Sequence, residues 1–220
     1  MRIQMKSLAA GPFGVRLPGR PYDVSEDEGA ALIAGGAAVA IASRPAPAEG
    51  GLFKRQWWRF YKELPTKFDE NVKQLVPVKF DEVVQSWDCA FKETQTSDFV
   101  VGQVWGRIGA DKYLLDQSRG RMDLPSTLQA VIRMTERWPA AQAKLIEDKA
   151  NGPAVIQLLK TKLSGLIAVN PEGGKEARAN AITPQIEAGN VYLPDPQKHP
   201  WVLDLIEECA SFPNSAHDDQ

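Results

Sequence analysis

The sequence is poor in cysteine, with only Cys89 and Cys209 among its 220 residues. Both lie in apolar patterns, and neither has the spacing of a zinc site. We expect two buried free thiols in a reducing compartment, with a disulfide between them as the less favoured alternative.

Long apolar runs and a strong net charge are also absent. No stretch is long enough to cross a bilayer as an apolar helix, and Met1–Lys6 lacks the apolar core of a signal peptide. The formal net charge is −2, so no global field marks the chain as a nucleic-acid binder. A DNA partner therefore requires a local basic surface. We expect a cytoplasmic protein that does not associate with membranes.

The apolar content suffices for one globular domain and a smaller appendage, at 43% hydrophobic and 25% charged residues. The stretch Arg44–Gly51 is rich in proline and glycine and reads as a linker. We therefore expect a small N-terminal α+β module of unknown role over residues 1–45. Residues 46–82 are predicted to be a linker with a basic and aromatic arm, and residues 83–220 to be the main domain.

The arm combines cations with aromatic side chains. Between residues 51 and 80, seven basic residues face three acidic ones, and five aromatic residues are interleaved between residues 53 and 61. Such a segment can contact phosphates and stack on bases. The alternative, which we favour, is that the aromatics pack on the next domain and the charges are solvated.

From residue 83 the pattern becomes that of an α/β domain. Strands are predicted at 83–91, 99–108, 112–117, 143–146, 166–169 and 191–193. Helices are predicted at 124–138 and 174–189, the latter interrupted at Pro184, and two further helices are predicted to begin at Pro153 and at Pro200. The first three strands follow one another closely, which predicts an antiparallel meander. Strand 143–146 is reached by a helical crossover and should pair in parallel with strand 83–91. A mixed sheet with helices on its faces follows, in the element order of the ribonuclease H-like architecture.

Three acidic clusters stand out against this pattern. Asp88 lies within a buried strand, where a carboxylate is costly unless it is paired, hydrogen-bonded or bound to a metal. Glu147-Asp148 follows strand 143–146, and Asp218-Asp219 stands near the end of the sequence. Taken singly, each cluster has another explanation: Asp88 as an acid bonded to backbone amides, Glu147-Asp148 as a solvated strand end, and Asp218-Asp219 as part of a polar tail. Taken together, they predict a site built around divalent cations.

Phosphodiester hydrolysis is the chemistry that such a site supports. Two divalent cations hold the attacking water and stabilise the leaving oxygen. Mg²⁺ and Mn²⁺ prefer oxygen ligands, which carboxylates from separate elements supply. We therefore expect a site with two Mg²⁺ or Mn²⁺ ions, in which Asp88 and Glu147 lie on adjacent strands.

Residues 50–220 resemble the nuclease half of phage terminase large subunits, the proteins that package phage DNA. The matching motifs run in family order: Gly51–Tyr61, Gln85–Lys92, Val101–Gly106, Ile146–Gly152, Glu187–Pro194 and Phe212–Gln220. The resemblance implies a ribonuclease H-like fold and metal-dependent cutting of double-stranded DNA. It assigns the metal ligands to Asp88, Glu147 and one or both of Asp218 and Asp219. It also implies the terminase small subunit and the portal as partners.

The sequence departs from the family in two ways. No Gly-x-x-x-x-Gly-Lys-Ser/Thr loop occurs, so we expect neither ATP binding nor ATP-dependent cutting. Only Gln220 follows Asp219, so the acidic pair is expected on a frayed end, with weak metal binding that an added helical extension would strengthen. The alternatives are another ribonuclease H-like nuclease, such as a resolvase or integrase, and a catalytically idle module that binds DNA or a packaging partner.

Overall fold

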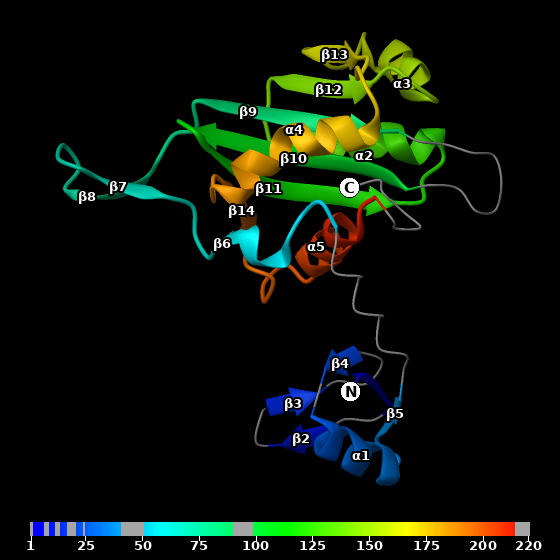
Figure 1. Cartoon of the computed structure of the whole chain (residues 1–220). Helices are drawn as coiled ribbons and strands as arrows, with labels where there is room; N and C mark the ends of the chain where they lie inside the picture. Colours follow the sequence, from blue (N-terminus) through cyan, green and yellow to red (C-terminus); the bar gives the residue numbers. More distant parts are fainter. Residues whose placement is uncertain are drawn as a thin grey trace. The chain divides into compact units, whose positions relative to one another are not determined.

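A seven-stranded mixed sheet organises the larger part of the structure (Figure 1). Its strands are β6 (Arg59–Tyr61), β9 (Glu82–Asp88), β10 (Val100–Ile108), β11 (Asp111–Gly120), β12 (Ala143–Glu147), β13 (Leu166–Val169) and β14 (Val191–Pro194). They lie in the order β13-β12-β9-β10-β11-β14-β6. The meander β9-β10-β11 is antiparallel and β12 pairs with β9 in parallel, which confirms both predicted pairings.

This computed structural model describes residues 2–6, 9–11, 14–16, 21–23, 25–40, 51–89 and 99–213. The chain forms two compact units, Met1–Glu49 and Gly50–Gln220. The predicted end of the first strand at Ala90 and Phe91 lies outside the described residues, as does the acidic pair Asp218-Asp219. Within the described part of the chain, no helix combines the length and the apolar character needed to span a bilayer.

One face of the sheet packs against helices α2 (Leu124–Arg137) and α3 (Gly152–Leu159). Trp87 is the largest fully buried side chain there, and its ring lies against Gly102, where an added Cβ would come within 2.4 Å of the ring. The Trp87 indole donates to Gln85 Oε1 at 3.1 Å, and Gln85 Nε2 donates to Thr135 Oγ1 at 3.2 Å. These contacts fix the face to which alternate residues of β9 point.

The opposite face is covered by α4 (Lys175–Glu187) and α5 (Trp201–Ser211), together with the segment before β6 that includes the 3₁₀ helix η1 (Arg55–Trp57). Phe53 and Trp58 are buried in this layer, as we favoured for the aromatic arm, whereas Phe60 of the same arm is 48% exposed. The sequence did not predict that β6 joins the sheet as an edge strand beside β14.

Residues 62–81 contain a further element that the sequence analysis did not identify. Strands β7 (Thr66–Asp69) and β8 (Gln74–Pro77) pair as an antiparallel hairpin between β6 and β9. Figure 1 shows this hairpin extending away from the seven-stranded sheet.

The smaller unit contains the sheet β4-β1-β5 and the pair β2-β3. Its elements are β1 (Arg2–Met5), β2 (Ala9–Gly11), β3 (Gly14–Arg16), β4 (Pro21–Asp23), α1 (Glu26–Ala34) and β5 (Ala38–Ala40). Ser25 caps α1, because its hydroxyl accepts a hydrogen bond from the backbone amide of Glu28 at 3.2 Å. Ile3 and Ala38 are buried against Leu32 and Ile33 of this helix.

The predicted interruption of helix 174–189 at Pro184 is wrong. Helix α4 is continuous from Lys175 to Glu187, with Pro184 inside it. The proline removes one N–H donor, but the Ala188 amide still bonds to the Pro184 carbonyl at 3.0 Å. One turn earlier, the Thr183 hydroxyl bonds to the Ala179 carbonyl at 2.9 Å. The bonds on both sides of the proline, together with the packing of Ile186 in the core, keep the helix intact.

Pro184→Ala is expected to raise the free energy of unfolding by about 1–3 kcal/mol, because it restores an interior helix hydrogen bond at an exposed position. Urea unfolding followed by circular dichroism measures the change. Pro153→Ala is the matched control: Pro153 lies in the first turn of α3, where the missing N–H costs nothing. Equal effects of the two substitutions would contradict this account of α4.

Candidate metal centre

Asp88 and Glu147 lie at the ends of two neighbouring parallel strands. The register of β9 and β12 pairs Val84 with Ala143 and Trp87 with Ile146. Asp88 follows Trp87 and is the last residue of β9, and Glu147 follows Ile146 and is the last residue of β12. Because the carboxyl ends of parallel strands meet at one edge of a sheet, the two acids emerge side by side at that edge.

The two acids also share a face of the sheet. On β9, Gln85 and Trp87 are buried toward α2 and α3, and on β12 Ile146 is buried in the same layer. Side chains alternate along a strand, so Asp88 and Glu147 point to the opposite face, the face covered by α4 and α5. Both are partly buried rather than fully solvated. The strand ends therefore present two carboxylates to the same space.

The charges of both carboxylates affect the pKa of the Cys89 thiol. Cys89 follows Asp88 and is 1% exposed. Burial raises the pKa of its thiol to about 12, and the negative charges of Asp88 and Glu147 contribute in the same direction. Cys89 and Cys209 are both free thiols.

The backbone around Glu147 is tightly packed. Gly152, the first residue of α3, faces the Glu147 carbonyl oxygen so closely that an added Cβ would lie 1.8 Å from it. The amide of Asp148 donates to the Val169 carbonyl of β13 at 2.7 Å. Lys149 Nζ lies 3.8 Å from Glu147 Oε1. These contacts fix the strand end that carries the acid.

Asp88 borders a cavity of about 470 Å³ on the α4–α5 face. Its apolar lining residues include Trp58, Trp105, Ile186 and Leu193. Its lining also contains three cations, Lys112, Lys175 and Arg178. These residues were not among the predicted site residues. The one signal for them in the sequence is the spacing of Lys175 and Arg178, which places them one turn apart on a helix.

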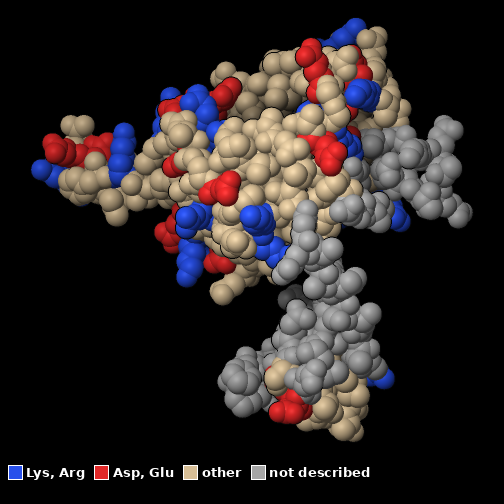
Figure 2. All heavy atoms as spheres, in the orientation of Figure 1, with Lys and Arg blue, Asp and Glu red and all other residues tan. Residues whose placement is uncertain are grey.

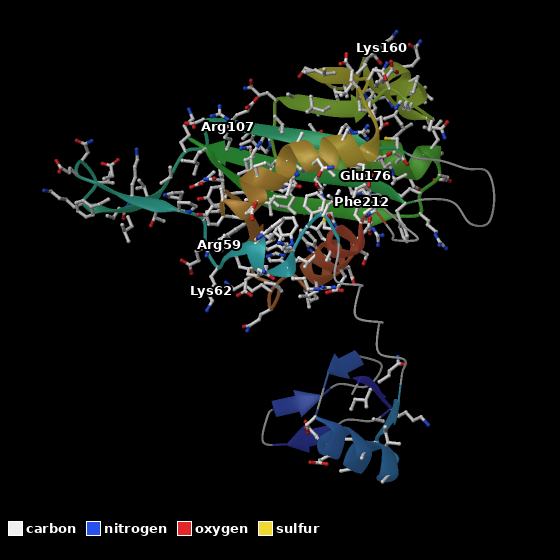
Figure 3. The ribbon with its side chains drawn as sticks, in the orientation of Figure 1. Arg59, Lys62, Arg107, Lys160, Glu176 and Phe212 are labelled. Atoms are coloured by element: carbon white, nitrogen blue, oxygen red, sulfur yellow. The ribbon has the colours of Figure 1, made fainter. Side chains whose placement is uncertain are left out.

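Glu208 of α5 also borders this cavity. Its carboxylate bonds to Arg119 Nη2 of β11 at 2.9 Å, and the Arg119 guanidinium lies 3.9 Å from the centre of the Phe99 ring. Across the sheet, Val101 of β10 pairs with both Asp88 and Arg119. The ion pair therefore lies two strands away from Asp88 and holds α5 against the same face of the sheet. Figure 3 shows the side chains of this region, with Phe212 labelled beyond the end of α5.

The donor set suits a hard divalent cation, since two carboxylates from separate strands offer the oxygen ligands that Mg²⁺ and Mn²⁺ prefer. Among the described residues, no three His, Cys, Asp or Glu side chains lie close enough together to hold a metal ion. The two acids assigned as the third ligand, Asp218 and Asp219, belong to the part of the chain that is not described. The roles of all four acids remain predictions.

Residues 85–220 match the family model described as the Terminase RNaseH-like domain. The structure is similar to that of the large terminase nuclease from thermophilic phage G20c with bound zinc, with a TM-score of 0.53 and 15% identity, over 76% of this chain and 91% of that one. For the cobalt-bound form of the G20c nuclease, the TM-score is 0.52 and the identity is 16%, over 79% of this chain and 93% of that one.

The large terminase of a second thermophilic bacteriophage matches at a TM-score of 0.46 and 13% identity over 62% of this chain, and the match spans 33% of that terminase. No curated protein matches the sequence. The likeness to the G20c nuclease shows the ribonuclease H-like fold that the element order predicted. Since the family model spans more than half of the sequence, the chain belongs to the family of terminase RNaseH-like domains.

Proposed function

We propose that residues 51–220 form a metal-dependent endonuclease that cuts double-stranded DNA during phage genome packaging. The observation that carries this proposal is the position of Asp88 and Glu147 at one edge and on one face of the sheet. Membership of the terminase family supports it. The G20c nuclease, which shares the fold, binds zinc and cobalt, which supports a divalent ion at this place.

In this proposal each acid has a distinct task. Asp88, at the end of the strand between β12 and β10, would be shared by two Mg²⁺ or Mn²⁺ ions. Glu147 would hold one of them, and Asp218 or Asp219 the other. When bound, the ions lower the pKa of the attacking water and stabilise the charge that develops on the phosphate. The protein supplies carboxylates at fixed strand ends, so little ordering entropy is lost when Asp88 and Glu147 take up a cation.

The DNA partner is expected to contact local cations, because the chain as a whole is slightly acidic. Figure 2 shows Lys and Arg side chains in separate groups around a mostly uncharged centre. Lys175 and Arg178 border the same cavity as Asp88 and are candidates for phosphate contacts. The family also suggests the terminase small subunit and the portal as partners.

Metal-dependent cutting by the whole chain tests the proposal. With Mn²⁺ or Mg²⁺, supercoiled plasmid should become nicked and linear, EDTA should stop the reaction, and added ATP should not change its rate. In parallel, loss of the electron paramagnetic resonance signal of free Mn²⁺ measures how many ions each chain binds, with two expected.

The two readouts separate the alternatives. Mn²⁺ binding without cutting would favour a catalytically idle packaging module that kept its metal site. Absence of both would overturn the proposed metal centre. Selective cutting of branched DNA over linear duplex would favour a resolvase.

A further inference from the structure

Two arginines at the end of β11 share one aromatic ring. The Cζ atom of Arg119 lies 3.9 Å from the centre of the Phe99 ring, and that of Arg121 lies 5.2 Å from the same centre. Both distances allow cation–π attraction, which orients a guanidinium relative to the ring. We call Arg119 and Arg121 the arginine pair.

The arginine pair lies at the same end of the sheet as the two candidate metal ligands. Strand β10 is antiparallel to both β9 and β11, so β9 and β11 run in the same direction, and β12 is parallel to β9. The last residues of these three strands, Asp88, Gly120 and Glu147, therefore lie at one edge of the sheet (Figure 1). Because Val101 pairs with both Asp88 and Arg119, these two side chains also point to one face.

The charge of the arginine pair is only partly balanced by acidic groups of the protein. Arg119 bonds to the Glu208 carboxylate at 2.9 Å. Arg121 is exposed, and within the described part of the chain no carboxylate forms an ion pair with it. Among these three groups one positive charge is in excess. A guanidinium stacked on a ring can still donate in its own plane, which is the geometry of a bidentate contact to phosphate.

We propose that Arg121, oriented by Phe99, binds a backbone phosphate of the DNA that is cut at the metal centre. This inference rests on the proposed nuclease function and gives Arg121 the role of a positioning residue. Neighbouring strands of a sheet lie ~4.8 Å apart, so about 10 Å separates β9 from β11. Each nucleotide of a DNA strand advances about 3.4 Å along the helix axis. The contacted phosphate is therefore about three nucleotides from the bond that is cut.

Binding of a fluorescently labelled DNA duplex to the whole chain in EDTA, followed by anisotropy at several salt concentrations, tests the contact. Arg121→Gln should weaken binding roughly three- to tenfold and reduce the slope of log K against log salt by about 1. Arg121→Lys should restore the slope but not the full affinity, because lysine keeps the charge and loses the planar bidentate geometry.

Arg133→Gln is the matched control for this measurement. It removes the same charge from an exposed position of α2, which covers the opposite face of the sheet. Its affinity for the duplex and its salt slope should equal those of the unmodified chain. A loss as large as that of Arg121→Gln would show that only the total charge of the protein matters, and would overturn the assignment of Arg121.

A single uncharged methylphosphonate linkage in the duplex locates the contact during cutting. With Mn²⁺, the unmodified chain should cut several-fold less at the bond about three nucleotides from the neutral linkage, because the Arg121 contact is lost there. Arg121→Gln should not show this local decrease, and it should bind as much Mn²⁺ as the unmodified chain. The same local decrease in Arg121→Gln would assign the contact to another residue.

These measurements separate the inference from the proposed nuclease function. If the unmodified chain does not cut DNA, the nuclease proposal fails, whereas the salt slope in EDTA still decides whether Arg121 binds a phosphate. If the unmodified chain cuts and Arg121→Gln binds the duplex with unchanged affinity and slope, the nuclease proposal stands and the inference is wrong. That result would assign the arginine pair to an acidic surface of a protein partner.

Discussion

Replacing Asp88 by asparagine is expected to abolish metal-dependent cutting of plasmid DNA while the fold is retained. Asparagine has nearly the size of aspartate but lacks the charge that a bridging ligand must supply. Metal stabilisation of the transition state contributes several kcal/mol, so we expect the rate to fall by about a thousandfold or more. Plasmid nicking in Mn²⁺ and in Mg²⁺, at equal protein concentrations, measures the loss.

Stability should not decrease in the same variant. Removing one of two neighbouring carboxylates relieves repulsion in the metal-free protein, so the free energy of unfolding should be unchanged or slightly higher. Glu82→Gln is the matched control, because Glu82 lies on the same strand and face as Asp88 but at the far end, where it is exposed. It should cut at the normal rate. Undiminished cutting by Asp88→Asn would show that Asp88 is not a ligand.

Gly152→Ala is expected to destabilise the protein and to weaken metal binding together. Alanine normally stabilises a helix relative to glycine. Here its Cβ would lie 1.8 Å from the Glu147 carbonyl oxygen, which is backbone and cannot move aside as a flexible side chain does. We expect about 1–3 kcal/mol of lost stability, with the strand end that carries Glu147 displaced. Urea unfolding and Mn²⁺ titration measure the two effects.

The control for this prediction is Gly174→Ala, at the start of α4, where an added Cβ meets nothing within 4 Å. Its stability should change by no more than about 0.5 kcal/mol, and its Mn²⁺ affinity should be unchanged. If Gly152→Ala instead behaves as an ordinary helix substitution and stabilises the protein, the close packing between α3 and the Glu147 backbone is not rigid.

Local patterns in the sequence determined most of the elements near the site. Short β-branched and aromatic runs separated by turns identified β9, β10 and β11. Asp123 directly precedes α2, and its carboxylate accepts a hydrogen bond from the Ser126 amide at 2.9 Å. The crossover through that helix predicted that β12 is parallel to β9. The adjacency of Asp88 and Glu147 follows from these local signals, since strand direction and residue position together determine which end of the sheet each acid occupies.

Only the tertiary structure decided the features that depend on distant partners. Phe53 and Trp58 become core residues because α5 and β14 are there to cover them, and β6 becomes a strand because β14 offers it hydrogen bonds. Pro184 remains inside a helix because neighbouring hydrogen bonds and the burial of Ile186 outweigh one lost donor. The cavity beside Asp88 and the exposed hairpin arise in the same way. The periodicity of apolar residues in the sequence indicates which side of a helix or strand is apolar. The surface against which that side packs is determined by residues far away in the sequence.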